Sequence, residues 1–242
     1  MANGSGVFAA EKRSMKIGII GAGKIGGALG EHWVRAGHKV LLSSRHPEEL
    51  QDLAKKLGPR ARTGLPREAA AFGEVILVSV PYAALPQIGR DYAAELNGKV
   101  VLDTCNPFPG RDGEMADTAR AKGAGIASAE FLPGTRLVRA FNALPHGALV
   151  GEAHRAGERI GIPLAADDRD ALAIAARLVE DAGFEPVVVG TLASAKEFDA
   201  GTDVFGRALT ARELRQALGI AKQKSETGVR GSSQGTNPIS LK

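Results

Sequence analysis

The 242-residue sequence predicts an α/β fold: a doubly wound, mostly parallel sheet with a small C-terminal α/β extension. Short aliphatic runs alternate with helix-like segments along most of the chain, as expected when crossover helices join parallel strands. The first of these runs breaks directly into glycines spaced G-x-G-x-x-G. Aromatic residues make up only 5% of the chain and aliphatic residues are abundant, which suits a sheet covered by helices on both faces.

The opening strand–helix–strand unit carries the most specific signal. Residues 16–20 read as a buried strand, a helix containing Leu29 and Trp33 follows, and a second strand is expected at residues 39–43. Glycines in this position let the backbone turn sharply and approach a pyrophosphate at the helix N-terminus. The context favours an NAD(P)-binding Rossmann fold over a structural glycine turn. The residues expected to contact the cofactor here are Gly21, Gly23, Lys24, Ile25 and Gly26.

The remaining elements follow in alternation, and local signals mark their ends. Asp167 or Asp168 caps one helix, and Thr210 with Glu213 has the form of a capping box at the start of the last helix. Further strands are expected at residues 62–64, 74–80, 99–103, 136–141, 160–165 and 185–190. Further helices are expected at residues 47–57, 67–72, 82–96, 114–122, 168–182 and 210–218.

These elements divide the chain into four expected segments. They are a flexible N-terminal extension at 1–14, an NADP-binding Rossmann domain at 15–142, a smaller C-terminal α/β part at 143–221 and a disordered tail at 222–242. The net charge is +4, but the two terminal segments account for all of it. Because the folded body is neutral overall, its charge gives no argument for a nucleic-acid-binding face.

Composition also indicates the cellular compartment in which the protein is expected. No segment is long and apolar enough to span a bilayer, and the first residues lack the apolar centre of a signal peptide. The single cysteine, Cys105, excludes an internal disulfide and is expected to be a small packed residue. The histidines lack metal-ligand spacing, and His32, His38 and His154 are expected at the surface. A soluble, cytoplasmic protein without a metal site is predicted.

The end of the second strand indicates which dinucleotide is bound. An NAD enzyme places Asp or Glu there to bond the ribose 2′-hydroxyl, but residues 43–46 contain no carboxylate. Two hydroxyls and a guanidinium suit a 2′-phosphate, so NADP is predicted. The alternative is that Arg45 only begins a solvated loop, and Glu48-Glu49 nearby would repel a badly placed phosphate. The residues expected to contact the cofactor here are Ser43, Ser44, Arg45 and His46.

Polar residues also follow later strands. Ligands of open α/β sheets lie beyond the carboxyl ends of the strands, where Asn106 and Asn142 place amides able to bond a carboxamide or a ribose. Asparagine is also common in turns for local reasons, so a purely structural role stays open. His146 contacts the second substrate or is an exposed loop histidine. Asn142 and His146 are the candidate catalytic residues.

Five blocks in series resemble the coenzyme F420-dependent NADP oxidoreductase family. They are IIGAGKIG at 19–26, LSSR at 42–45, SVPY at 79–82, DTCNP at 103–107 and VRAFN at 138–142, and the resemblance covers roughly residues 16–189. It implies an NADP-binding Rossmann domain, a smaller C-terminal part that helps to hold the deazaflavin, and a homodimer. Ser44 and Arg45 would take the 2′-phosphate. Val80-Pro81 and Asn106-Pro107 would flank the nicotinamide half, and Phe141-Asn142 would lie where the two rings meet.

The predicted function is hydride transfer between NADP(H) and a planar redox cofactor such as coenzyme F420. The two rings carry this chemistry themselves, so a site of amides, prolines and glycines without a catalytic triad is sufficient. Alternatives are an NADPH-dependent reductase of another acceptor (flavin, quinone, metal chelate or imine) and a non-catalytic NADP sensor. Neither nucleic acid nor a membrane is expected as a partner.

Overall fold

The computed structural model describes residues 13–220. The expected disordered tail and all but two residues of the expected N-terminal extension lie outside the described residues. Those two residues contact the folded body: the Ser14 hydroxyl donates to the Gly37 oxygen over 2.8 Å, and the Arg13 oxygen accepts from Arg177.

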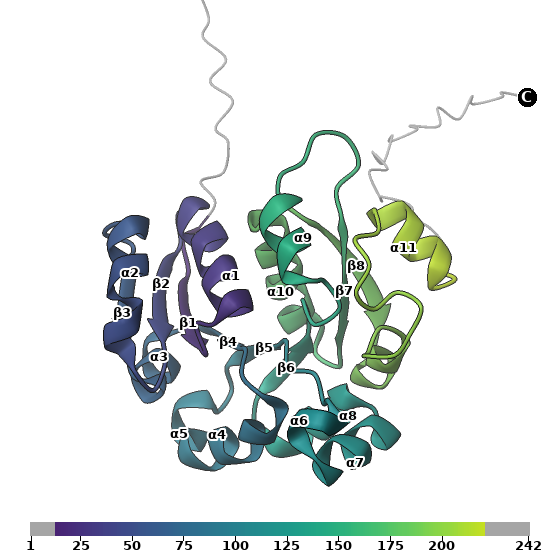
Figure 1. Ribbon diagram of the computed structural model, residues 1–242, viewed down its shortest axis with the longest axis horizontal. Helices are drawn as coiled ribbons and strands as arrows, with labels where there is room; N and C mark the ends of the chain where they lie inside the picture. Colours follow the sequence, from purple (N-terminus) through teal and green to yellow (C-terminus); the bar gives the residue numbers. More distant parts are fainter. Residues whose placement is uncertain (1–12, 221–242) are drawn as a thin grey trace, which may run out of the picture.

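The core of the molecule is one eight-stranded sheet in the order β3-β2-β1-β4-β5-β6-β7-β8 (Figure 1). The first six strands have the order typical of dinucleotide-binding proteins, with the direction of winding reversing between β1 and β4. All neighbours are parallel except β6 and β7. The predicted fold class is confirmed, and the C-terminal part adds two strands to the same sheet. The strands are β1 (Lys16–Ile20), β2 (Lys39–Ser43), β3 (Ala61–Gly64), β4 (Val75–Val78), β5 (Val100–Asp103), β6 (Arg136–Arg139), β7 (Gly161–Ala166) and β8 (Glu185–Gly190).

Helices cover both faces of this sheet (Figure 1). Those at one face pack Leu29, Trp33 and Leu178 onto it, and those at the other pack Leu85 and Leu96. The α-helices are α1 (Lys24–Arg35), α2 (Gln51–Leu57), α3 (Pro66–Phe72), α4 (Leu85–Asp91), α5 (Ala93–Leu96), α6 (Pro109–Asp112), α7 (Glu114–Lys122), α8 (Ala124–Phe131), α9 (His146–Gly151), α10 (Arg169–Asp181) and α11 (Ala211–Ala217). Short 3-10 helices occupy Pro47–Leu50, Tyr82–Ala84 and Leu192–Glu197. Within residues 13–220 no helix is long and apolar enough to cross a membrane.

The predicted helix caps are confirmed. The Asp168 carboxylate accepts from the Ala171 nitrogen over 2.9 Å at the start of α10, and Thr210 and Glu213 form the capping box of α11. The Asp168 carboxylate also forms a bidentate ion pair with Arg136, whose Nε and Nη2 donate to it over 2.6 and 2.9 Å. The Arg136 guanidinium holds the pKa of this carboxyl well below its usual range.

Three α-helices were not predicted: α6, α8 and α9. The first, α6, has only four residues and lies between a predicted strand and a predicted helix. The segment that forms α8, AGIASAEF, is apolar on most sides, so it lacks the helical hydrophobic periodicity that a one-sided helix shows. The third, α9, is a six-residue helix that begins at His146, in a segment where the sequence predicts a loop. The helix expected over 82–96 is also interrupted: Tyr92 has φ of −116° and separates α4 from α5. The strand expected over 136–141 ends at Arg139.

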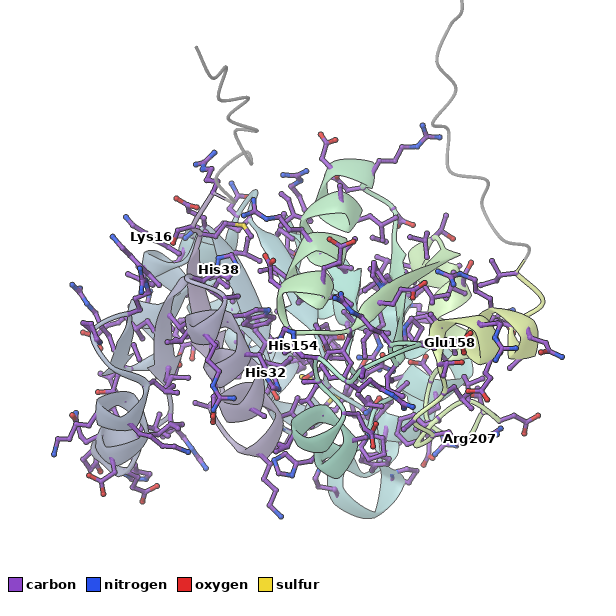
Figure 2. All side chains as sticks on the ribbon, turned by 90° about the horizontal axis from the view of Figure 1, so that it is seen from above. Lys16, His32, His38, His154, Glu158 and Arg207 are labelled. Carbon is purple, nitrogen blue, oxygen red and sulfur yellow. The ribbon has the colours of Figure 1, made fainter. Side chains whose placement is uncertain are left out.

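The prediction that His32 and His38 lie at the surface is wrong. They are 6% and 1% exposed, whereas His154 is exposed as expected (Figure 2). His38 Nδ1 accepts from the Met15 nitrogen over 3.1 Å, and its Nε2 lies 3.0 Å from Asp181 Oδ2 on α10. His32 Nε2 lies 2.9 Å from the Leu149 oxygen on α9. Both partners come from helices more than a hundred residues later in the sequence.

Candidate cofactor and active site

The glycine-rich segment forms the turn between β1 and α1. Gly21 has φ of +95°, and a Cβ there would lie 2.3 Å from the Ser79 oxygen. A Cβ at Gly26 would lie 2.2 Å from the Gly21 oxygen. These two positions therefore require glycine for the fold itself.

Gly23 is different from its neighbours. It has φ of −74°, and a Cβ there would meet nothing within 4 Å among the described residues. The fold alone would accept a side chain at this position. The open space lies at the N-terminus of α1, whose first turn contains no acidic residue. Backbone N–H groups and the helix dipole make such an end a site for phosphate, so the structure fits a bound pyrophosphate here.

The end of β2 lies beside this loop. Ser43 is buried; its hydroxyl donates to the Ile19 oxygen over 2.6 Å and its main-chain oxygen accepts from the Ala22 nitrogen over 2.8 Å. Ser43 therefore shapes the glycine loop, and its predicted contact with the cofactor stays a prediction. The half-buried Ser44 hydroxyl accepts from the His46 nitrogen over 2.9 Å.

Arg45 is exposed, and its guanidinium makes no hydrogen bond or ion pair with any residue of 13–220. The exposed His46 ring lies 3.3 Å from the Glu48 carboxylate. A free cation at this end of β2 is what a 2′-phosphate would need. Its role in cofactor binding is untested and stays a prediction.

Val80 and Pro81 follow β4 on the other side of the glycine loop. A Cβ at Gly21 would lie 2.8 Å from a Val80 methyl, so Val80 borders the turn directly. Pro81 is exposed. The Val80 nitrogen donates to Cys105 Sγ over 3.5 Å, and burial raises the pKa of this thiol well above its ordinary value. Cys105 is therefore a buried packing residue, as predicted.

Asn106, Asn142 and His146, which the sequence marked separately, line one pocket of about 250 Å³. Ile25 of the glycine loop lies at the same pocket, so the pocket adjoins the N-terminus of α1. The other lining residues are Thr104, Phe141, Ala143, Leu144, Pro145, Phe205 and Gly206. Phe205 and Gly206 reach the pocket because the Gly206 nitrogen donates to the Ala143 oxygen over 2.8 Å, a contact with no local signature in the sequence.

The amide of Asn142 has one satisfied end and one unsatisfied end. Its nitrogen lies 3.4 Å from both Asn106 Oδ1 and the Phe198 oxygen, and 3.5 Å from Asp199 Oδ1. Three acceptors on one side fix which end of the amide points there. Asn142 is 5% exposed, and its Oδ1 is buried without a partner among the described residues. An unpaired buried acceptor costs about 1–3 kcal/mol, so this oxygen is suited to accept from an N–H group of a ligand.

The backbone before Asn142 is strained. Phe141 has φ of +57°, a left-handed conformation that non-glycine residues rarely adopt. Its buried ring packs edge-on against Trp33 and Phe184, with centroid distances of 6.2 and 6.4 Å. This packing holds the turn that presents Asn142. Strained residues that persist in a core often occur at functional sites.

A buried ionic cluster beneath the pocket was not predicted. The fully buried Arg139 of β6 pairs with Asp103 Oδ2 over 2.9 Å and with Asp199 Oδ1 over 3.0 Å, and it also donates to Asn106 Oδ1 over 2.9 Å. Arginine and aspartate at the ends of two buried strands were the available signal, but the partner Asp199 lies 60 residues further along the chain.

A second pocket, of about 150 Å³, adjoins this cluster. It is lined by Pro107, Asp199 and Thr202, together with the exposed cations Arg120 and Lys196. Neither cation forms an ion pair with any residue of 13–220. The Thr202 hydroxyl is buried without a partner among the same residues. This pocket offers positive charge and a hydroxyl next to Asn106-Pro107.

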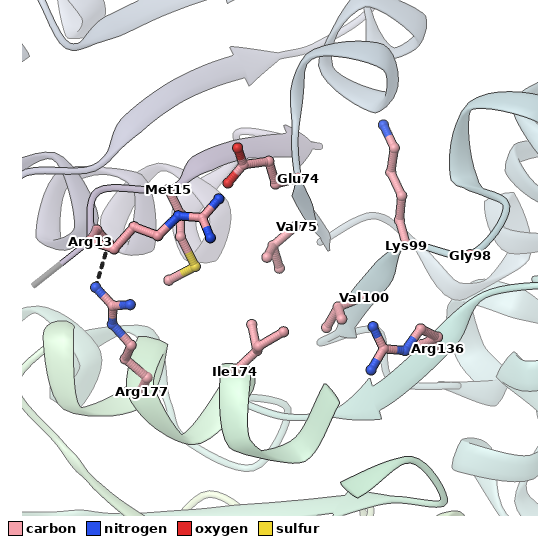
Figure 3. Close-up of a pocket in the computed structure, with 10 residues that line it drawn as sticks. All are labelled: Arg13, Met15, Glu74, Val75, Gly98, Lys99, Val100, Arg136, Ile174 and Arg177. Carbon is pink, nitrogen blue, oxygen red and sulfur yellow. Dashed lines mark hydrogen bonds between the residues drawn. The ribbon is translucent and has the colours of Figure 1, made fainter. Parts of the chain in front are cut away.

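A larger hollow of about 540 Å³ lies at the opposite ends of the strands, where β4, β5 and β6 begin (Figure 3). Its floor is apolar, with Met15, Val75 and Ile174, and arginine side chains surround it. Two of these arginines are engaged: Arg136 with Asp168, and Arg177 with the Arg13 oxygen. Ligands of doubly wound sheets bind at the carboxyl ends of the strands, so this hollow is not the candidate active site.

Residues 16–107 match the family model described as NADP oxidoreductase, coenzyme F420-dependent, which confirms the resemblance over these residues. No curated protein matches the chain.

Solved structures share the fold. A hypothetical protein from Sinorhizobium meliloti has 26% sequence identity and a TM-score of 0.69, over 82% of this chain and 96% of its own. A protein from an Arthrobacter species, provisionally assigned as an F420-dependent NADP reductase, has 20% identity and a TM-score of 0.67, over 86% of this chain and 96% of its own. An imine reductase from Myxococcus stipitatus has 19% identity and a TM-score of 0.57, over 78% of this chain and 59% of its own. The fold is therefore that of NAD(P)-binding oxidoreductases.

Proposed function

We propose that this protein is an NADP-dependent oxidoreductase that transfers hydride between NADP(H) and a planar redox cofactor such as coenzyme F420. The observation that carries the proposal is the arrangement around Gly23. This open position at the N-terminus of α1 lies between the unpaired Arg45 after β2 and a pocket lined by Asn106 and Asn142. A dinucleotide needs a cation, a phosphate cradle and an amide-lined pocket in this order across the point where the sheet reverses.

Each part of the cofactor has candidate residues in this arrangement. Arg45, with Ser44 and His46, would hold the 2′-phosphate, and the backbone N–H groups of residues 21–26 would hold the pyrophosphate. Val80-Pro81 and Pro107 would flank the nicotinamide half. The unpaired Oδ1 of Asn142 would accept from the carboxamide N–H.

NADP(H) supplies the hydride chemistry when bound, and the protein has to align the reacting rings and exclude water. The pocket supports this division of labour. Of the described residues that line it, His146 is the only one with a titratable side chain, and it is exposed at the start of α9. Reduction of a carbonyl normally needs a positioned proton donor. A deazaflavin or flavin ring accepts hydride without one.

The second pocket supports an anionic second substrate. Arg120 and Lys196 give it two cations without an ion-pair partner among the described residues, and it adjoins the amide-lined pocket through the neighbouring residues Asn106 and Pro107. A molecule with its ring in the first pocket and a phosphate or carboxylate in the second would fit this pair. Coenzyme F420 and flavin mononucleotide both have this chemistry.

Two alternatives remain. The hydride acceptor would instead be a quinone, a metal chelate or an imine, or the protein would bind NADP as a sensor without turnover. Homodimer formation and a cytoplasmic location also stay predictions.

The test is an NADPH oxidation assay with stereospecifically deuterated NADPH and a panel of acceptors: coenzyme F420, flavin mononucleotide, a quinone, a ferric chelate and a cyclic imine. We expect F420 or the flavin to remove deuterium from only one of the two labelled forms of NADPH, which is read from the label left in NADP+, and we expect slow turnover of the other acceptors. Preferential turnover of a quinone, chelate or imine would replace the proposed acceptor. Tight NADPH binding without turnover of any acceptor would favour the sensor.

A further inference from the structure

We propose that Arg139 is a positioning residue for the nicotinamide end of the cofactor, acting through the amides of Asn106 and Asn142. The inference rests on the proposed function. Arg139 has no exposed surface and lies beneath the pocket, so it would act through its neighbours and not by contact with a ligand.

The argument begins with shared acceptors. Arg139 Nη2 donates to Asn106 Oδ1 over 2.9 Å and to Asp199 Oδ1 over 3.0 Å. The Asn142 amide nitrogen lies 3.4 and 3.5 Å from these same two oxygens. The guanidinium therefore fixes two of the three acceptors around the Asn142 nitrogen, the third being the Phe198 oxygen, and so helps to set the direction of the Asn142 oxygen.

A second set of contacts fixes Asn106. With its Oδ1 held by Arg139, the Asn106 nitrogen donates to the Asn142 oxygen over 2.8 Å. Arg139 Nη1 also donates to the Cys105 oxygen, directly before Asn106. One planar group thus locks both the side chain and the preceding backbone of Asn106.

Charge explains why an arginine can be held in this place. Burial opposes the charge of Arg139, but Asp103 and Asp199 outweigh it and raise the pKa of Arg139 above its ordinary value. The fork of the guanidinium reaches both carboxylates, Asn106 and a carbonyl at once. Lysine carries the same charge but has a single nitrogen without this planar geometry. Arg139→Lys therefore keeps the charge balance and removes the alignment.

The experiment compares two ligands by isothermal titration calorimetry: NADP+ and 2′-phospho-ADP-ribose, which lacks nicotinamide. In Arg139→Lys we expect the Kd for NADP+ to rise about tenfold, the equivalent of one hydrogen bond. The Kd for 2′-phospho-ADP-ribose should change by less than about twofold, because the residues that would bind its phosphates follow β1 and β2. Arg136→Lys is the matched control, because it makes the same change at the amino end of the same strand, away from the amide-lined pocket. It should leave both Kd values unchanged.

Equal loss of both ligands, or no loss of NADP+, would overturn the inference. If circular dichroism shows Arg139→Lys to be unfolded, Asp199→Asn replaces it, because it removes one charge from the same acceptor. Asp199→Asn must then show the same selective loss of NADP+, and equal or absent losses overturn the inference there too. Failure of the unaltered protein to bind either ligand would instead refute the proposed function, and the inference with it.

Discussion

The Asn106 side chain donates to the Asn142 main-chain oxygen over 2.8 Å and so ties together the ends of β5 and β6, which are 36 residues apart in the sequence. This bond joins two of the residues that line the amide-lined pocket. It also means that the two asparagines form one unit, so a change at either one should affect the geometry of both.

The three glycines of the β1–α1 turn should differ in their response to alanine. Gly23→Ala should leave the melting temperature unchanged, since a Cβ there meets nothing within 4 Å in residues 13–220. It should weaken NADPH binding by at least about tenfold, because the methyl group would occupy the approach of the pyrophosphate.

Gly26→Ala is the matched comparison. Its Cβ would lie 2.2 Å from the Gly21 oxygen, so the turn must shift, at a cost of about 1–3 kcal/mol in unfolding free energy. Thermal unfolding and NADPH titration of both variants separate the two roles. A large loss of stability in Gly23→Ala would contradict a ligand-related role for this glycine.

Arg45→Ala should weaken NADPH binding by about 1.5–3 kcal/mol, the contribution of a hydrogen bond to a charged group. Binding of NADH should barely change, because it lacks the 2′-phosphate. Arg60→Ala, which removes an exposed arginine at the amino end of the neighbouring strand, should change neither affinity. Equal losses of NADPH and NADH in Arg45→Ala would show that Arg45 does not recognise the phosphate.

His32 should make the protein less stable in mild acid. Burial lowers the pKa of His32 below 6.5, while its bond to the Leu149 oxygen opposes the shift and nearby His154 adds to it. As the pH falls below about 6.5, the unfolded chain takes up a proton that the folded imidazole resists, so the free energy of unfolding decreases.

His32→Gln removes this titration but keeps a donor for the Leu149 oxygen. The decrease in melting temperature from pH 7.5 to pH 5.5 should therefore be smaller in the variant than in the unaltered protein. His46→Gln, at an exposed histidine, should keep the full decrease. An unchanged decrease in His32→Gln would assign the acid sensitivity to another group.

Much of the fold could be predicted from the sequence because its signals are local. The central strands, such as β4, are short aliphatic runs buried on both faces, and the Asp168 and Thr210 caps act on residues within three positions of themselves. The glycine turn was equally clear, since Gly21 and Gly26 are required by backbone contacts within the turn and the adjacent strand.

The missed features depend on contacts between distant parts of the chain. His38 is buried because α10 brings Asp181 to it from 143 residues away. Arg139 is tolerated in a buried strand because Asp199 returns to it after two more strands. No pattern in the residues next to either one reveals these partners. The amides of the candidate site were predicted from their positions at strand ends, but the contact network that orients them required the structure.

Replacement of Asn142 tests the hydride step. Asn142→Leu is nearly equal in size but removes the unpaired oxygen and the contacts to Asn106 and Asp199. Since misalignment of reacting groups by about 1 Å can cost about a hundredfold in rate, kcat/KM for coenzyme F420 or flavin mononucleotide should fall about 10- to 100-fold. NADPH should still bind through the phosphate groups. Asn97→Leu, at an exposed amide on the other side of β5, should leave both properties unchanged.

The acceptor panel decides what a negative result means. If Asn142→Leu turns over the acceptor at the normal rate, the amide does not align the rings. If simple aldehydes or ketones are reduced rapidly while deazaflavins and flavins stay inert, the pocket must contain a proton donor. His146 would then be the first candidate, because it is the only titratable side chain among the described residues that line the pocket. His146→Gln should in that case abolish the carbonyl reduction and its dependence on pH, with NADPH binding retained.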